Sequence, residues 1–127
     1  MKINHVALYT NNLETMKQFY VSYFKGKENH LYENKKKGFK SYFISFEDDT
    51  RLELMSQGEV TGNAGSPNHL GFIHLAFSAG DKDRVDQLTN KLAEDGYKII
   101  SGPRTTGDGY YESCILDPDG NQIEIVI

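Results

Sequence analysis

The sequence contains two copies of one pattern, and this internal repeat constrains the fold more than any other feature. The tetrapeptide His5-Val6-Ala7-Leu8 is matched 69 residues later by His74-Leu75-Ala76-Phe77. At the same offset, the apolar helix positions Met16, Phe19 and Tyr23 correspond to Val85, Leu88 and Leu92. Near the end of each copy, Leu52-Glu53-Leu54 corresponds to Ile123-Glu124-Ile125. Matches that keep their order along the whole chain indicate a duplicated unit.

Each copy is predicted to run strand, helix and three further strands. Alternating and β-branched residues predict the strands, while an N-cap residue and a closing glycine bound each helix. In the first copy the strands cover Ile3–Tyr9, about Glu28–Glu33, Phe39–Phe46 and Arg51–Met55, with a helix between the caps Asn11 or Asn12 and Gly26. In the second they cover Phe72–Phe77, about Tyr97–Ser101, Tyr110–Leu116 and Gln122–Ile127, with a helix between Asp81 and Gly96.

The two copies are too small to be stable separately. A segment of about 60 residues buries little apolar surface alone, whereas the full 127 residues suit one core. We therefore predict a single α+β domain over residues 1–127. Its modules span about residues 1–57 and 71–127, their sheets combine, and the Gly- and Asn-containing stretch 58–70 is a connector.

Composition excludes several classes of protein. The net charge of −4 argues against nucleic acid as the main partner. No apolar run reaches the length of a membrane span, and the N-terminus lacks the pattern of a secretory signal. The single cysteine, Cys114, lies in an apolar strand and is expected to be a core residue. We expect a cytoplasmic protein that acts on a small molecule and binds neither nucleic acid nor membrane.

The repeat also places a histidine and a glutamate in each copy. Strand alternation puts Glu53 and Glu124 on the face opposite their apolar neighbours. An ionised carboxylate there must face solvent, meet a cation or coordinate a metal, because burying it unpaired is costly. Pseudo-symmetry would allow His5, Glu53, His74 and Glu124 to converge. Imidazole and carboxylate together suit zinc, nickel, iron, cobalt or manganese.

Four segments carry a resemblance to a known superfamily: NHVALYTNNLETMKQFY, RLELM, FIHLAF and LDPDGNQIEIVI. They resemble the vicinal oxygen chelate superfamily, and the order His-Glu-His-Glu resembles its glyoxalase I (lactoylglutathione lyase) members. The resemblance implies a cupped eight-stranded mixed sheet built from two βαβββ modules, with a metal inside the cup. It also implies a homodimer, and it leaves open whether the metal site forms within one chain or across two.

By this resemblance, His5, Glu53, His74 and Glu124 are the ligands of one divalent metal ion per site. Zinc or nickel is expected ahead of manganese, cobalt or iron. The implied reaction isomerises a hemithioacetal, formed from a 2-oxoaldehyde and a thiol, through an enediolate. Glu124 would take the proton next to the carbonyl, and Glu124 or Glu53 would return it to the neighbouring carbon.

The expected substrate contacts differ from those of enzymes that use glutathione. Tyr9 stands where such members carry an arginine, and Ser56-Gln57 where they carry an asparagine. Since tyrosine cannot form a bidentate pair with a carboxylate, another thiol or another chelating substrate is favoured. Arg104 and Tyr110, from a glycine-containing loop, join Tyr9 and Gln57 as predicted substrate-binding residues.

Two other functions are compatible with the sequence. A metal-dependent thiol transferase of antibiotic resistance would use two histidines and one glutamate, which leaves Glu53 surplus. A metal-free module could instead bind an aromatic or drug-like ligand. The presence of both glutamates argues against this binding module, because it would have no need to bury two carboxylates.

Overall fold

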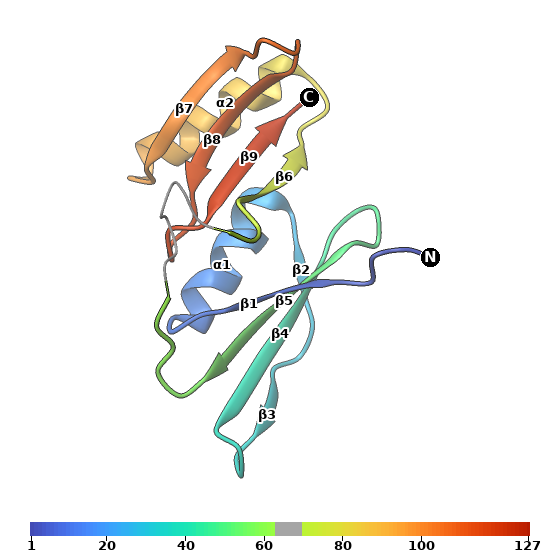
Figure 1. Ribbon diagram of the computed structural model, residues 1–127, viewed down its shortest axis with the longest axis vertical. Helices are drawn as coiled ribbons and strands as arrows, with labels where there is room; N and C mark the ends of the chain where they lie inside the picture. The colour runs from blue at the N-terminus through green and yellow to red at the C-terminus, as the bar shows by residue number, and fades with distance from the viewer. Residues whose placement is uncertain (63–69) are drawn as a thin grey trace. The chain divides into compact units, whose positions relative to one another are not determined.

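The computed structural model of the 127-residue chain describes residues 1–62 and 70–127 (Figure 1). The chain divides into two compact units, Met1–Gly62 (unit 1) and Asn63–Ile127 (unit 2). Residues 58–62 of the predicted connector form neither helix nor strand, and residues 63–69 lie outside the described part. Neither helix in the described ranges is long and apolar enough to cross a membrane.

Unit 1 contains one helix and one mixed sheet. Its elements are β1 (Val6–Tyr9), α1 (Leu13–Phe24), β2 (Lys27–Glu28), β3 (Tyr32–Asn34), β4 (Phe39–Ser45) and β5 (Arg51–Gln57). The strand order is β1-β5-β4-β2, and β3 also pairs with β4. The first strand, β1, lies parallel to the last, β5, whereas the remaining pairs are antiparallel.

Unit 2 repeats this arrangement. Its elements are β6 (His74–Ser78), α2 (Lys82–Glu94), β7 (Ile99–Thr105), β8 (Tyr111–Leu116) and β9 (Gln122–Val126). The strand order is β6-β9-β8-β7, and its first strand again lies parallel to its last. The predicted α+β class and the duplicated strand–helix–strand pattern are thus confirmed. The combination of both units into a single domain stays a prediction.

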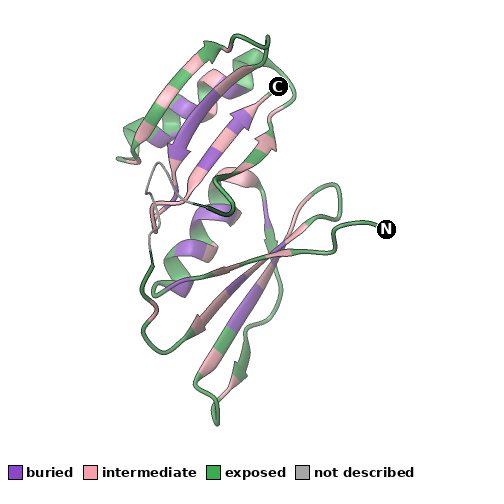
Figure 2. Ribbon diagram, viewed as in Figure 1, coloured by how far each residue is buried: buried purple, intermediate pink, exposed green. Residues whose placement is uncertain are grey.

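Each unit packs its helix against one face of its sheet, and most of the buried apolar residues lie between the two (Figure 2). Alternate residues of β5 and β9 face this core, which leaves Glu53 and Glu124 on the opposite face. Tyr20, rather than the predicted Tyr23, is fully buried on α1. The fully or almost fully buried apolar residues include Met16, Phe19, Ile44, Leu52 and Leu54 in unit 1 and Val85, Leu92, Ile115, Ile123 and Ile125 in unit 2.

Several strand boundaries differ from the prediction. The strand expected over about Glu28–Glu33 is two short strands, because Asn29 accepts a hydrogen bond from the Phe43 amide through its side chain and interrupts the ladder. Strand β1 begins at Val6 instead of Ile3, so His5 lies just before it. Strand β7 continues to Thr105, past the predicted end at Ser101, since register shifts accommodate the residues around Gly102.

The two helix ends use their glycines differently. Gly96 has a φ of +90° and closes α2: its amide donates to Ala93, and the Tyr97 amide donates to Leu92, which is a Schellman motif. In α1 the left-handed residue is Lys25, not Gly26. Gly26 is needed for space, because a Cβ there would lie 2.3 Å from Cγ2 of Ile44.

The helix starts differ as well. Asp81 caps α2 as predicted, accepting from the Arg84 amide at 2.9 Å. Asn12 occupies the N-cap of α1 without a side-chain hydrogen bond to the helix. Instead the backbone amide of Asn12 donates to Oγ1 of Thr10, at 2.9 Å.

A buried hydroxyl pair joins α2 to β8 in unit 2, and replacing one member is expected to destabilise the protein. Thr89 donates to the Val85 carbonyl at 2.7 Å, so Ser113 donates to Oγ1 of Thr89 at 2.6 Å. Thr89→Val would leave the Ser113 hydroxyl without this acceptor and cost about 1–3 kcal/mol in urea unfolding. The double variant Thr89→Val/Ser113→Ala should recover most of the loss. Equal stability of the single variant and the wild type would contradict this account.

In unit 1, the carboxylate of Glu14 links α1 to β4 through Tyr42 and should make stability depend on pH. Glu14 accepts from Lys17 at 2.6 Å and from the Tyr42 hydroxyl at 2.7 Å. The bond to Lys17 has the larger effect and that to Tyr42 the smaller, and together they hold the pKa of Glu14 below its ordinary value. The stability that ionised Glu14 contributes is therefore complete above its pKa in the unfolded state. It is lost as pH falls through its pKa in the folded state. Because Glu14 is exposed, Glu14→Gln should cost only about 0.5 kcal/mol near neutral pH.

Urea unfolding of wild type and Glu14→Gln, at neutral and at strongly acid pH, measures this dependence. The two proteins should converge at acid pH, where Glu14 is protonated in both states. A constant difference at every pH would show that the carboxylate charge makes no contribution.

Candidate metal centre

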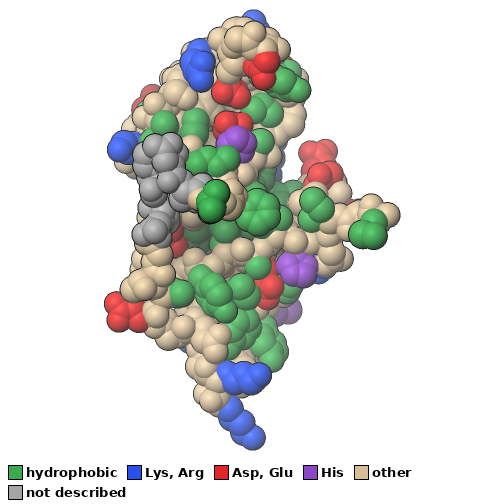
Figure 3. Space-filling view, viewed as in Figure 1, with side chains coloured by type: hydrophobic (Ala, Val, Ile, Leu, Met, Phe, Trp, Pro, Cys, Tyr) green, Lys and Arg blue, Asp and Glu red, His purple; other side chains and the backbone are tan. Residues whose placement is uncertain are grey.

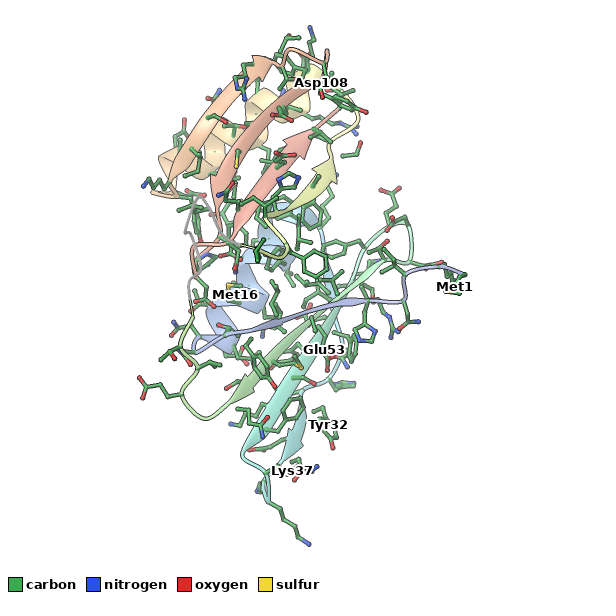
Figure 4. The ribbon with its side chains drawn as sticks, viewed as in Figure 1. Met1, Met16, Tyr32, Lys37, Glu53 and Asp108 are labelled. Carbon is green, nitrogen blue, oxygen red and sulfur yellow. The ribbon has the colours of Figure 1, made fainter. Side chains whose placement is uncertain are left out.

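Strand register places one histidine and one glutamate on the same sheet face in each unit. Glu53 lies opposite Ala7 in the parallel pair β1–β5, and Glu124 lies opposite Ala76 in β6–β9 (Glu53 is labelled in Figure 4). His5 and His74 each stand two residues before these alanines, on the face turned away from the helix. The space-filling view shows a histidine beside an acidic side chain at the surface of each unit (Figure 3).

In unit 1 the histidine and the carboxylate face each other without a hydrogen bond. Nε2 of His5 lies 3.7 Å from Oε2 of Glu53, and the side chains are 38% and 16% exposed, respectively. The Phe43 ring, opposite Glu53 in the sheet, meets the His5 ring edge-on with centroids 5.3 Å apart. Glu53 is therefore sheltered from water while its oxygen remains close to the imidazole.

The other nitrogen of His5 has a partner of its own. Its Nδ1 lies 2.9 Å from Oδ1 of Asn4. The same Oδ1 accepts a short hydrogen bond from Nη2 of Arg51. Arg51 in turn places its guanidinium carbon 4.8 Å from the centroid of the Phe43 ring. The four side chains thus form one connected group beside Glu53.

In unit 2 the pair is closer. Nδ1 of His74 lies 3.2 Å from Oε1 of Glu124, with the side chains 35% and 20% exposed. Burial raises the pKa of the Glu124 carboxyl; the charge of Glu112 adds to this rise, while His74 and Arg104 oppose it. Cys114 lies opposite Glu124 on β8, and burial raises the pKa of its thiol too.

The donor set and its spacing fit a divalent metal ion. Two ligands about 2.0–2.2 Å from one ion, at tetrahedral or octahedral angles, lie about 2.8–3.6 Å apart. The observed nitrogen–oxygen separations, 3.7 Å and 3.2 Å, are close to this range. Imidazole nitrogen with carboxylate oxygen suits zinc, nickel, manganese, cobalt and iron.

The structure brings the four predicted ligands together as two pairs, one within each unit. Among residues 1–62 and 70–127, no group of three or more His, Cys, Asp or Glu side chains is arranged to hold a metal ion. The convergence of His5, Glu53, His74 and Glu124 on a single ion therefore stays a prediction.

The predicted substrate-binding residues lie in both units. Tyr9 and Gln57 lie on β1 and β5, at positions that alternate onto the Glu53 face, and both are exposed. Arg104, on β7, lies 3.8 Å from the Glu112 carboxylate. Tyr110 is 58% exposed in the turn before β8, where its carbonyl accepts from the Thr106 amide at 2.8 Å. Their contact with a substrate stays a prediction.

Sequence reasoning did not find the group around His5. Asn4 and Arg51 are 47 positions apart and meet only because β1 pairs with β5, so no local pattern joins them. Cys114 is buried as expected, on the Glu124 face and not against the helix. The alternation Glu112-Ser113-Cys114 puts Cys114 on the same face as the charged Glu112, and this signal could have assigned Cys114 to the face opposite the helix.

Comparison with known proteins agrees with the fold. The "Uncharacterized protein YqjT" of Bacillus subtilis (strain 168) is 30% identical to this chain. The match covers 98% of this chain and 97% of that protein. Glyoxalase I from Zea mays superposes with a TM-score of 0.81 at 22% identity, over 98% of this chain, which spans only 44% of the maize chain. The trypanothione-dependent glyoxalase I of Leishmania major gives 0.78 at 19% identity, over 99% of this chain and 86% of that one.

At these identities the two glyoxalase structures establish the fold alone. The family model of the Glyoxalase/Bleomycin resistance protein/Dioxygenase superfamily matches residues 2–125. Because the match covers nearly every residue, and the structure has the duplicated unit that the sequence resemblance implies, this chain belongs to the glyoxalase/bleomycin resistance protein/dioxygenase superfamily, also called the vicinal oxygen chelate superfamily.

Proposed function

We propose that the protein is a divalent-metal-dependent lyase of the glyoxalase I type. One observation carries this proposal: a histidine–glutamate pair occupies equivalent register positions in both units, with its nitrogen and oxygen 3.7 Å and 3.2 Å apart. Residues with separate structural roles would have no reason to repeat this pairing on the face away from the core.

His5, Glu53, His74 and Glu124 would hold one divalent ion per site, with zinc or nickel ahead of manganese, cobalt or iron. When bound, such an ion supplies Lewis-acid stabilisation for the negative charge that develops on the substrate oxygens.

The two glutamates would move the proton. Glu124 accepts the proton from the carbon next to the carbonyl, and Glu124 or Glu53 returns a proton to the neighbouring carbon. The hemithioacetal becomes a 2-hydroxy thioester, so atoms and electrons balance without an oxidant. The burial of Glu124 supports this role, because a carboxylate with little water around it is a stronger base.

The thiol of the substrate is proposed to differ from glutathione. Tyr9 provides no fixed positive charge for a glutathione carboxylate. Arg104 on β7 would offer a positive charge to the substrate, and Tyr9, Gln57 and Tyr110 would offer polar groups. The Leishmania relative is named for trypanothione, which shows that glyoxalase I proteins differ in their thiol.

Two measurements on the purified protein test the function. Elemental analysis should find about one zinc, nickel or related ion per chain. Methylglyoxal mixed with glutathione, cysteine derivatives or coenzyme A should then yield a thioester with at least one thiol. Bound metal without turnover for any thiol would refute the lyase, and turnover that survives complete metal removal would refute the metal's role. Gel filtration tests the homodimer that we propose alongside.

A further inference from the structure

We propose that Asn4 and Arg51 act as a clamp that fixes the tautomer and ring orientation of His5, so that Nε2 presents its lone pair toward Glu53. Both would be positioning residues, acting through His5. The proposal rests on the proposed function only for the identity of what His5 binds, because the tautomer is a property of the metal-free chain.

The hydrogen-bond chemistry of the clamp leaves one assignment for each atom. A guanidinium has donors only. The Asn4 atom that Arg51 contacts must therefore be the amide oxygen, which excludes the flipped side chain. An oxygen can only accept, so the His5 nitrogen 2.9 Å away must carry a proton. In the neutral ring this places the proton on Nδ1 and the lone pair on Nε2.

Nε2, which carries the lone pair, lies near a second electron-pair donor, the Glu53 carboxylate. Oε2 of Glu53 is 3.7 Å away, beyond hydrogen-bond distance. A cation needs neighbouring ligand atoms that each offer an electron pair, and Nε2 and Oε2 are two such atoms held side by side. Hydrogen bonding of the remote ring nitrogen is how proteins commonly orient a metal-binding histidine.

Rigid elements hold the clamp. Arg51 is the first residue of β5, two positions before Glu53 and on the same face. Its guanidinium lies against the Phe43 ring, which also contacts the His5 ring. A movement of Arg51 would therefore disturb the amide of Asn4 and the packing of His5 together.

Within residues 70–127, the described part of unit 2, the clamp has no equivalent at the matching positions. Ile73 stands at the position that matches Asn4, and Gln122, two residues before Glu124, at the position that matches Arg51. There the nitrogen that faces the carboxylate is Nδ1 instead of Nε2. The chain thus contains its own control, one clamped histidine and one unclamped histidine.

Long-range ¹⁵N–¹H NMR on the metal-free protein tests the clamp, at about pH 8.5, where an ordinary imidazole is neutral. His5 should show the Nδ1–H pattern in the wild type. Asn4→Leu should convert it to the Nε2–H pattern that free histidine prefers, and Asn4→Asp, which keeps an acceptor, should retain Nδ1–H. The His74 pattern should be the same in all three proteins.

Zinc affinity provides a second readout. Loss of an orienting partner weakens metal binding about 10- to 100-fold, so Asn4→Leu should bind zinc that much more weakly and Asn4→Asp should not. An Nε2–H pattern for His5 in the wild type, or an unchanged pattern in Asn4→Leu, would overturn the clamp. If the NMR result is as expected but no variant binds metal, the clamp stands and the proposed function fails.

Discussion

Glu124→Gln is expected to lower kcat/KM about 10²- to 10⁴-fold, the usual contribution of a positioned proton acceptor. The amide has the shape of the carboxylate but cannot take the proton next to the carbonyl. It also lacks the negative charge that a divalent ligand set needs. Turnover of the methylglyoxal hemithioacetal, with the best thiol found for the wild type, measures the loss.

Two controls separate chemistry from folding in this variant. Glu94→Gln removes the same charge from unit 2, at the exposed last residue of α2, and should leave kcat/KM unchanged. With both proteins stripped of metal, the thermal midpoint of Glu124→Gln should stay at or above that of the wild type, because a largely buried carboxylate whose pKa burial raises is replaced by a neutral group. Near wild-type turnover of Glu124→Gln would refute its role as the base.

Gly102→Ala is expected to cost about 3 kcal/mol of stability. Gly102 has a φ of +81°, where a side chain adds about 1–2 kcal/mol of strain. A Cβ would also lie 2.5 Å from the carbonyl oxygen of Glu112 and 2.9 Å from Cα of Ser113. Both contacts are with the backbone of β8, which cannot rotate away, so overpacking adds a further cost of about 1–3 kcal/mol.

The same hairpin offers a matched control for this substitution. Gly107 lies in the turn between β7 and β8, and a Cβ there would meet nothing within 4 Å. Gly107→Ala should change stability by less than about 0.5 kcal/mol in urea unfolding. If the two variants unfold at the same urea concentration, the close approach at Gly102 does not constrain the fold.

The sequence predicted the features that depend on neighbours along the chain. The alternation in Leu52-Glu53-Leu54 assigned Glu53 to the face away from the core, and Ile123-Glu124-Ile125 did the same for Glu124. Asp81 and Gly96 bounded α2 correctly, because capping involves residues within one helical turn. Side-chain periods of two and of 3.6 are local properties, so they can be identified without the fold.

Tertiary pairing decided the features that depend on distant partners. Parallel pairing of β1 with β5 brings His5 to Glu53 and Asn4 to Arg51, and no local pattern encodes which atoms then face one another. Helix α1 ends just before Gly26 as expected, but Lys25 is the left-handed residue there, and Gly26 is needed to make room for Ile44 of β4. The sequence alone thus determined which residues share a face, while the side-chain contacts were set by strand register and close packing, which act between segments far apart in the chain.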